Sequence, residues 1–254
     1  MDKRNDLGIN LIGYAAGYSA GESGGGGGGG VNTAVSVTGS LQNAFWIIDW
    51  KDLTIPDTLT TLTGLFFNWR CCNAPKISFN NNITNLEYIY NGCWTPKIDM
   101  SGWDITNVTS FYYAFSGARA TEFVFPTTHC TANNVNCTSM IQGVSGTTID
   151  FSGLYIEKVS KIDYICYGLQ NVTSIDLRNL QSTGSPTATW AFYNCKALQH
   201  LDIRGLGGVI SGMNMLTNVP TDCEIIVKND AVKSAWNTSY PAYTNVKTVA
   251  EYEG

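Results

Sequence analysis

A phased pattern of apolar residues runs through most of this chain and restricts the folds it can adopt. Short strand-like segments recur at intervals of 21 to 26 residues, each centred on one apolar residue: Ile77, Ile98, Phe123, Ile149, Ile175, Leu201 and Ile225. Eight to ten residues before each stands a second apolar anchor: Phe67, Tyr90, Phe115, Ile141, Tyr167, Phe192 and Leu216. A unit of this length cannot bury its own apolar face, so the repeat predicts a stack in which each unit covers the next.

Within each unit the strand alternates between outward polar and inward apolar positions. In the unit that begins at Lys97, Ile98 is inward, Asp99 outward and Met100 inward. Strands of successive units are therefore expected to pair as one continuous parallel ladder. The apolar spacing before each strand is close to helical but too short for a stable helix. We therefore expect a turn of helix or an irregular arch on the other face of each unit.

The repeats divide the chain into five segments. Residues 1–23 form a partly apolar tail, and the consecutive glycines of 24–30 form a linker. An array of repeats needs atypical ends that cover its terminal apolar faces. We therefore expect an N-terminal cap over 31–58, a solenoid over 59–228 and a C-terminal cap over 229–254.

The two cap segments break the period of the array. Val31 to Val37 alternates apolar and polar residues and predicts a strand. After the array, Asn229 and Asp230 favour the start of a short helix that runs through Trp236 and ends before Pro241. The last apolar alternation, over 246–252, predicts a final strand.

The N-terminal tail carries apolar side chains that its own segment cannot bury: Leu11, Ile12, Tyr14 and Tyr18. One interpretation is a disordered tail and linker. The other is a docking peptide that becomes ordered in a larger assembly, tethered by the polyglycine linker to a separate body. In the second case these four side chains anchor the chain.

Composition excludes several classes of function. A net charge of −5 without any basic run argues against a general electrostatic grip on nucleic acid. The chain lacks the apolar run of about 20 residues that a membrane span needs. The N-terminal apolar stretch is interrupted by polar residues and glycines, and makes a poor secretory signal. We therefore expect synthesis in a cytoplasm without export by the usual route.

The eight cysteines are scattered along the chain. Cys93, Cys166 and Cys195 fall at similar places in successive repeats, after apolar or aromatic residues. A column of small buried thiols explains this placement better than disulfide bridges do. We expect mostly reduced, structural cysteines.

Several units resemble a known repeat family. Thr-Asn-Val-Thr at 106–109 with Ala-Phe-Ser-Gly at 114–117, and Ala-Phe-Tyr-Asn-Cys-Lys-Ala-Leu-Gln-His-Leu-Asp-Ile at 191–203, resemble the BspA-type leucine-rich repeat. The Ser-Gly-Trp-Asp at 101–104 is similar to the same pattern. The resemblance covers about residues 59–228 and departs at 118–147, where we expect one irregular or bulged unit.

This resemblance implies a leucine-rich-repeat solenoid, α/β but mostly β, with about seven repeats and a cap at each end. In that family such solenoids occur in bacterial surface adhesins and in proteins of bacterial viruses. They are binding scaffolds, so the resemblance brings no catalytic residues.

Four aspartates share one outward strand position: Asp99, Asp150, Asp176 and Asp202. On adjacent strands they would lie about 5 Å apart, where like charges repel. One interpretation is a cation-binding stripe. We favour another, in which each aspartate accepts a hydrogen bond from a neighbouring turn. The column also belongs to a candidate ligand-binding face that includes Lys97, Glu122, Ser174 and His200.

No pattern of catalytic or metal-binding residues stands out. Cysteine and histidine pairs do not recur at zinc-site spacing, and no nucleophile or phosphate-loop motif is present. We expect no enzyme activity, cofactor or metal. The aromatic residues exceed what a solenoid core needs, and either stack in the core or form a docking or sugar-stacking patch: Trp69, Trp94, Trp103, Tyr112, Tyr113, Tyr155 and Trp190.

These observations favour a non-catalytic virion protein of a bacteriophage, resembling a fibre or adhesin. Residues 1–23 would contact other virion proteins, and the solenoid would bind a host-surface glycan or protein within an assembly of several copies. Two alternatives stay open: a purely structural decoration protein of the capsid or tail, and a protein-interaction module at a bacterial cell surface.

Overall fold

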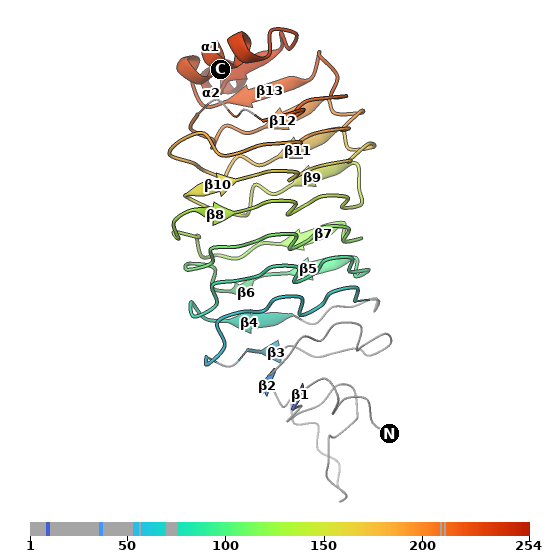
Figure 1. The fold of residues 1–254 in the computed structure, drawn as a ribbon, viewed down its shortest axis with the longest axis vertical. Helices are drawn as coiled ribbons and strands as arrows, with labels where there is room; N and C mark the ends of the chain where they lie inside the picture. Colours follow the sequence, from blue (N-terminus) through green and yellow to red (C-terminus); the bar gives the residue numbers. More distant parts are fainter. Residues whose placement is uncertain are drawn as a thin grey trace, which may run out of the picture.

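The computed structural model describes residues 9–10, 36–37, 53–55, 57–69, 76–208, 210 and 212–254. In this part the chain forms a β-solenoid of about seven turns with little helix, its coils stacked along one long axis (Figure 1). The stacked, mostly β architecture predicted from the repeat is confirmed. The predicted anchor residues Leu11, Ile12, Tyr14 and Tyr18 lie outside the described residues.

The front of the solenoid carries the strands predicted from the repeat. They are β5 (Lys97–Asp99), β7 (Glu122–Val124), β9 (Thr148–Asp150), β11 (Ser174–Asp176), β12 (His200–Asp202) and β13 (Glu224–Val227). They are followed by β14 (Val246–Thr248), which corresponds to the strand predicted after the array. The pairs β5–β7 and β9–β11–β12–β13–β14 are parallel and in the predicted register, with Ile98 opposite Phe123 and Ile175 opposite Leu201. The inward positions of this strand are confirmed, since Ile98 and Met100 are buried, whereas Lys97 is exposed and Asp99 half-buried. The predicted outward position is wrong at Asp202, which is fully buried.

Two details of the predicted ladder are wrong. The ladder is not continuous, because β7 and β9 belong to separate sheets. Ile77 does not belong to the column of Ile98 either. It begins β4 (Ile77–Phe79), which pairs with β6 (Gly102–Trp103) and with β3 (Leu53–Thr54) in a neighbouring column.

The remaining strands are short. β8 (Val135–Asn136) pairs in parallel with β10 (Val159–Lys161) on a third side of the coils. β1 (Ile9–Asn10) and β2 (Ser36–Val37) form an antiparallel pair, so two residues of the predicted strand at 31–37 are in a strand.

Opposite the front strands, each coil folds into a six-residue turn, which confirms the predicted irregular arch. The seven turns span 63–68, 87–92, 112–117, 138–143, 163–168, 189–194 and 213–218. In every turn the second and the sixth residue have positive φ. Consecutive turns are joined by backbone hydrogen bonds, for example from the N–H of Tyr90 to the carbonyl of Ala114.

The fourth residue of each turn points into the core. Tyr90, Phe115, Ile141, Phe192 and Leu216 are buried there as predicted. Two of the predicted anchors are wrong by one residue: the buried side chains belong to Phe66 and Cys166, whereas Phe67 and Tyr167 are half-buried.

The described cysteines are all buried: Cys93, Cys130, Cys137, Cys166, Cys195 and Cys223. Burial raises the pKa of the Cys195 thiol to about 12 and that of Cys130 to about 11. These thiols therefore act as small apolar core residues, as the repeat predicted. Cys71 and Cys72 lie outside the described residues.

Two helices lie at the C-terminal end of the stack (Figure 1). The helix α1 (Asp230–Ser239) begins as predicted at Asn229, whose side chain accepts a hydrogen bond from the N–H of Val232. Its Trp236 is fully buried. The predicted last strand is shorter than expected, because β14 ends at Thr248 and the helix α2 (Val249–Glu253) follows.

Candidate binding surfaces

The aspartate column serves the turns that follow the strands. The N–H two residues further on donates to the aspartate side chain at Asp99, Asp150, Asp176 and Asp202, over 2.9 to 3.2 Å. At Asp99, partial burial alone would raise the carboxyl pKa, but hydrogen bonds from Ser101 outweigh it and hold that pKa below its usual value. The favoured interpretation, in which aspartate accepts from a turn, is therefore confirmed.

Two of the four aspartates are also neutralised by arginine. Arg178 and Arg204 donate from Nε to Asp176 and Asp202 over 2.8 to 3.0 Å. The side chain of Asp202 is fully buried, and its carboxylate forms an ion pair with Arg204. The column therefore does not present four free carboxylates to a ligand.

The predicted ligand-binding face is a set of charge pairs across neighbouring strands. The Nζ of Lys97 lies 2.6 Å from a carboxylate oxygen of Glu122. His200 Nδ1 lies 2.9 Å from Glu224, whose other oxygen is 2.6 Å from Lys247. The hydrogen bond from Lys247, ahead of that from His200, lowers the pKa of Glu224. Ser174 lies directly opposite His200 in the ladder.

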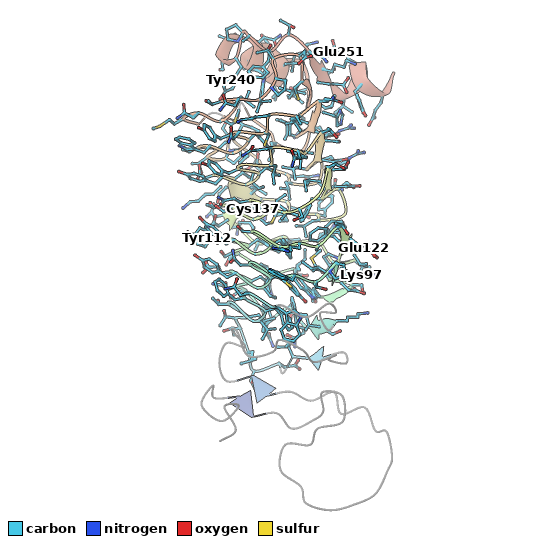
Figure 2. The ribbon with its side chains drawn as sticks, turned by 90° about the vertical axis from the view of Figure 1, so that its right-hand side faces the viewer. Lys97, Tyr112, Glu122, Cys137, Tyr240 and Glu251 are labelled. Atoms are coloured by element: carbon cyan, nitrogen blue, oxygen red, sulfur yellow. The ribbon has the colours of Figure 1, made fainter. Side chains whose placement is uncertain are left out.

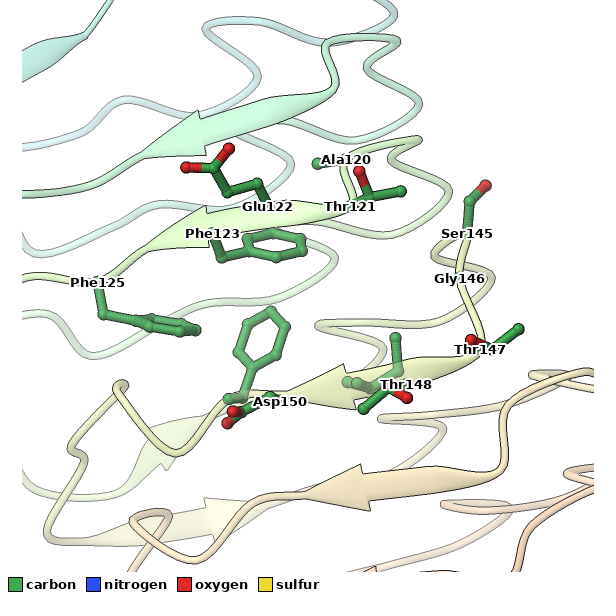
Figure 3. Close-up of a pocket in the computed structure, with 12 residues that line it drawn as sticks. Ala120, Thr121, Glu122, Phe123, Phe125, Ser145, Gly146, Thr147, Thr148 and Asp150 are labelled. Atoms are coloured by element: carbon green, nitrogen blue, oxygen red, sulfur yellow. The ribbon is translucent and has the colours of Figure 1, made fainter.

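The front face is hollowed where the ladder opens. A groove of about 520 Å³ lies between β7 and β9 and is lined by Glu122 and Asp150 from adjacent coils (Figure 3). The Glu122 carboxylate is turned away from Asp150, toward Lys97 of β5. Thr121, Thr147 and Thr148 lie at its edge, and Phe123, Phe125 and Phe151 form its apolar wall. Two residues of the predicted face therefore line a cavity that the sequence analysis did not predict.

Phenylalanine side chains hold the two strands apart. The ring centroid of Phe151 is 4.9 Å from that of Phe123 and 5.3 Å from that of Phe125. Phe125 also lies so close to Gly153 that any Cβ there would be 2.3 Å from its ring. Phe123 is only half-buried, whereas Ile98, Ile149 and their counterparts further along the column are buried. The predicted irregular unit at 118–147 is confirmed at this point.

A second surface runs along the turns on the opposite side from Lys97 and Glu122, as the position of Tyr112 in Figure 2 shows. We call it the aromatic stripe, defined by Tyr88, Tyr112, Tyr113, Tyr164, Tyr167, Trp190 and Tyr193. All seven rings are half-buried or exposed. They form two clusters, one on the turns 87–92 and 112–117 and one on the turns 163–168 and 189–194.

The rings within each cluster are in contact. In the first cluster the centroids of Tyr88 and Tyr113 are 5.3 Å apart and stacked. Burial, together with hydrogen bonding to Tyr112, raises the pKa of Tyr88 to about 12. In the second cluster Tyr164 and Trp190 are parallel within 1° at 6.2 Å, and Trp190 lies 4.5 Å from Tyr193.

The backbone beneath the stripe is strained. Tyr88, Tyr113, Tyr164 and Trp190 occupy the second position of their turns, with φ between 53° and 58°. An L-residue with a Cβ loses roughly 1–2 kcal/mol in this left-handed region, and a bulky one is an outlier there. Gly64 and Asn214, which tolerate this conformation, occupy the same position in the first and last turns.

The seven aromatic residues singled out in the sequence lie in different parts of the structure. Trp69 and Trp103 are buried in the core. Tyr112, Tyr113 and Trp190 belong to the aromatic stripe. Elsewhere, Arg119 lies 3.8 Å above the ring of Trp94, and Tyr155 stacks on His129 at 4.1 Å.

The sequence analysis did not single out four members of the aromatic stripe as surface aromatics: Tyr88, Tyr164, Tyr167 and Tyr193. The recurrence of aromatic residues at the second and fifth turn positions was the available signal. Among the described residues, no group of three histidine, cysteine or acidic side chains is placed to hold a metal ion. The described helices are all too short or too polar to cross a membrane.

Comparison with known proteins finds no significant match to a family model, to a curated protein or to a solved structure. The resemblance to the BspA-type leucine-rich repeat therefore stays a prediction from the sequence.

Proposed function

We propose that this chain is a non-catalytic binding protein whose aromatic stripe recognises a glycan on a host-cell surface. The observation that carries the proposal is the set of seven half-buried or exposed rings on the turns, four of them on left-handed backbone. Tyrosine and tryptophan combine an apolar ring face with a polar hydroxyl or N–H group. This combination suits a sugar, whose ring has an apolar C–H face and a polar hydroxyl edge.

Energetics argue that the stripe is kept for a reason other than stability. Each contact between rings contributes about 0.5–1.5 kcal/mol beyond its burial. The left-handed backbone costs roughly 1–2 kcal/mol at each of Tyr88, Tyr113, Tyr164 and Trp190. The two terms are of similar size, so stacking offsets the strain and leaves little net gain. Strain of this kind concentrates at functional sites.

The test compares the wild-type chain with Tyr164→Asn and Trp190→Asn on an array of bacterial surface polysaccharides. Asparagine removes the ring but tolerates positive φ, as Asn214 does in the same column. We expect each variant to bind about tenfold more weakly or worse while unfolding at an unchanged or higher temperature. Asn214→Gly is the matched control at the same turn position and should bind normally.

Two results would count against a glycan-binding stripe. One is a wild-type chain that retains no polysaccharide on the array. The other is wild-type affinity in both ring-deleted variants, which would place binding elsewhere on the solenoid.

We further propose that the chain is displayed on a bacteriophage particle and anchored through residues 1–23. The support comes from the sequence. A partly apolar segment stands first, a polyglycine linker follows it, and the repeat body after the linker is low in charge. The full chain and a chain that starts at Val31 would be compared for incorporation into particles and for sedimentation with host cells. Binding to cells without incorporation of the shorter chain is the expected result.

The main alternative is a structural decoration subunit without a receptor. It predicts that both chains join particles and that neither sediments with cells. Thermal unfolding of the two chains, compared first, shows whether the shorter one keeps its fold.

A further inference from the structure

We propose that the open ladder between β7 and β9 accepts an extended peptide of a partner protein, which adds as a strand. The proposal concerns the front face and does not depend on the aromatic stripe, which lies on the other side of the coils (Figure 2).

The first argument is an incomplete set of backbone hydrogen bonds. The N–H of Glu122 donates to Pro96, and the carbonyl of Val124 accepts from Met100. Because backbone groups alternate along a parallel strand, the N–H and C=O of Phe123 therefore face β9. Both strands are described, and no backbone hydrogen bond joins β7 to β9. The N–H of Ser145 donates to the carbonyl of Ala118 over 3.2 Å, so the coils stay joined ahead of the two strands.

The facing edge of β9 is open in the same way. The carbonyl of Thr147 accepts from Thr173 of the next coil, and the N–H of Phe151 donates to Asp176. By the same alternation, the N–H and C=O groups of Thr148 and Asp150 face β7. Unpaired strand edges recruit extended chains, since main-chain hydrogen bonds provide the affinity.

The second argument concerns side chains. The half-buried rings of Phe123 and Phe125 offer an apolar wall for one face of an added strand. Glu122 and Asp150 are exposed at the same groove (Figure 3). Among the described residues, none that lines the groove is a lysine or an arginine.

Charge and apolar surface together define the occupant. Lys97 pairs with Glu122 from outside the groove, so the carboxylate of Asp150 is the less neutralised of the two. A peptide with alternating apolar and polar residues and a lysine or arginine on its outward side complements this arrangement. A neutral or acidic strand would leave the carboxylate of Asp150 without a basic partner.

The experiment selects binders to the full-length protein from a displayed library of random decapeptides and then measures their affinities as synthetic peptides. We expect enriched peptides with alternating apolar residues and a basic residue. In the free protein, the amide hydrogens of Phe123, Thr148 and Asp150 should exchange rapidly with solvent. Peptide binding should slow that exchange, which binding through side chains alone would not do.

Three variants locate the site. Thr148→Pro removes a backbone donor that faces the opening and should weaken binding about fivefold, by the loss of one hydrogen bond. Glu122→Gln and Asp150→Asn should each weaken it about two- to fivefold, as for an exposed ion pair. Asp99→Asn is the matched control at the same strand position on another coil, and should bind normally.

Several outcomes overturn the proposal. They are the absence of any enriched peptide, enrichment of acidic peptides, unchanged amide exchange in the complex, and wild-type affinity in both Thr148→Pro and Asp150→Asn. If Thr148→Pro fails to fold, Asp150→Asn decides, since asparagine keeps the acceptor for the N–H of Ser152. Loss of glycan binding in the ring-deleted variants tests the aromatic stripe separately.

Discussion

Substitution of the aspartates in the column distinguishes a structural role from repulsion between stacked charges. Asp150 is exposed, and its side chain accepts from the N–H of Ser152. Its replacement by alanine removes one solvent-exposed hydrogen bond, so we expect a loss of about 0.5–1.5 kcal/mol in the free energy of unfolding.

The same substitution at Asp202 should be far more costly. This carboxylate is fully buried and accepts from the backbone N–H and the Nε of Arg204. The Arg204 side chain is itself only 12% exposed and would lose its buried partner. Breaking a buried pair at one member costs about 3–5 kcal/mol when the remaining charge is left uncompensated. Because Arg204 keeps its second, exposed partner Glu253, the loss should lie toward the lower end of that range.

The assay is equilibrium unfolding in urea followed by circular dichroism, with unchanged m-values as evidence that both variants fold alike. Asp202→Asn keeps a side-chain acceptor for the turn and should fall between alanine and wild type. The double substitution Asp202→Ala with Arg204→Met should recover part of the loss. Equal costs at the two positions, or a gain in stability from either alanine, would refute the turn-and-arginine account and favour a repulsive column.

Two further predictions concern the core. Because burial raises the thiol pKa of Cys195 and of Cys223 to about 12, the native protein keeps these thiols protonated. Its free energy of unfolding should therefore fall between about pH 8 and about pH 10, where only the unfolded thiols ionise. Urea titrations across that range check the sign; Cys195→Ala should flatten the slope. Trp236→Ala should cost about 3–5 kcal/mol if the C-terminal helix covers the last coil. Tyr252→Ala, at a ring that is 40% exposed, is the control for thermal unfolding.

The stacking of coils was predictable because burial imposes the same spacing in every unit. The register was predictable wherever one apolar residue stood between polar neighbours, as at Ile98 and Ile175. The buried residue of the turn was predicted wrongly at Phe67 and Tyr167. In both turns an adjacent residue is also apolar, and only the three-dimensional turn decides which side chain is buried. The short interval between Ile77 and Ile98 was a sign that β4 belongs to another column.

The two candidate surfaces were less accessible to sequence reasoning. A pattern of aromatic residues does not show whether a ring lies inside or outside a turn, and the left-handed backbone that turns Tyr88 and Trp190 outward is a property of the folded coil. The groove was hidden for a different reason. Phe123 satisfies the apolar pattern of its column, and its volume, together with that of Phe125 and Phe151, opens the ladder only after the coils stack.

The irregular unit at 118–147 shapes both surfaces. On the front it opens the ladder, and on the turns it places Ser139 where both neighbouring coils carry a ring. The turn backbone continues through this coil, since Phe115 donates to Met140 and Ile141 to Ile165. The interruption of the stripe is therefore made by side chains alone, and Ser139 is buried with no hydrogen-bond partner for its hydroxyl.

This gap sets the length of ligand that the stripe favours. Tyr113 and Tyr164 lie two coils apart, which is about 10 Å at the usual spacing of stacked strands. A monosaccharide therefore contacts one cluster, whereas an oligosaccharide bridges both and gains from linked binding. Affinity should rise steeply once a glycan is long enough to bridge, and Trp190→Asn should abolish that rise while leaving the binding of short glycans to the Tyr88 cluster unchanged. A smooth increase with length in both proteins would show that the clusters act independently.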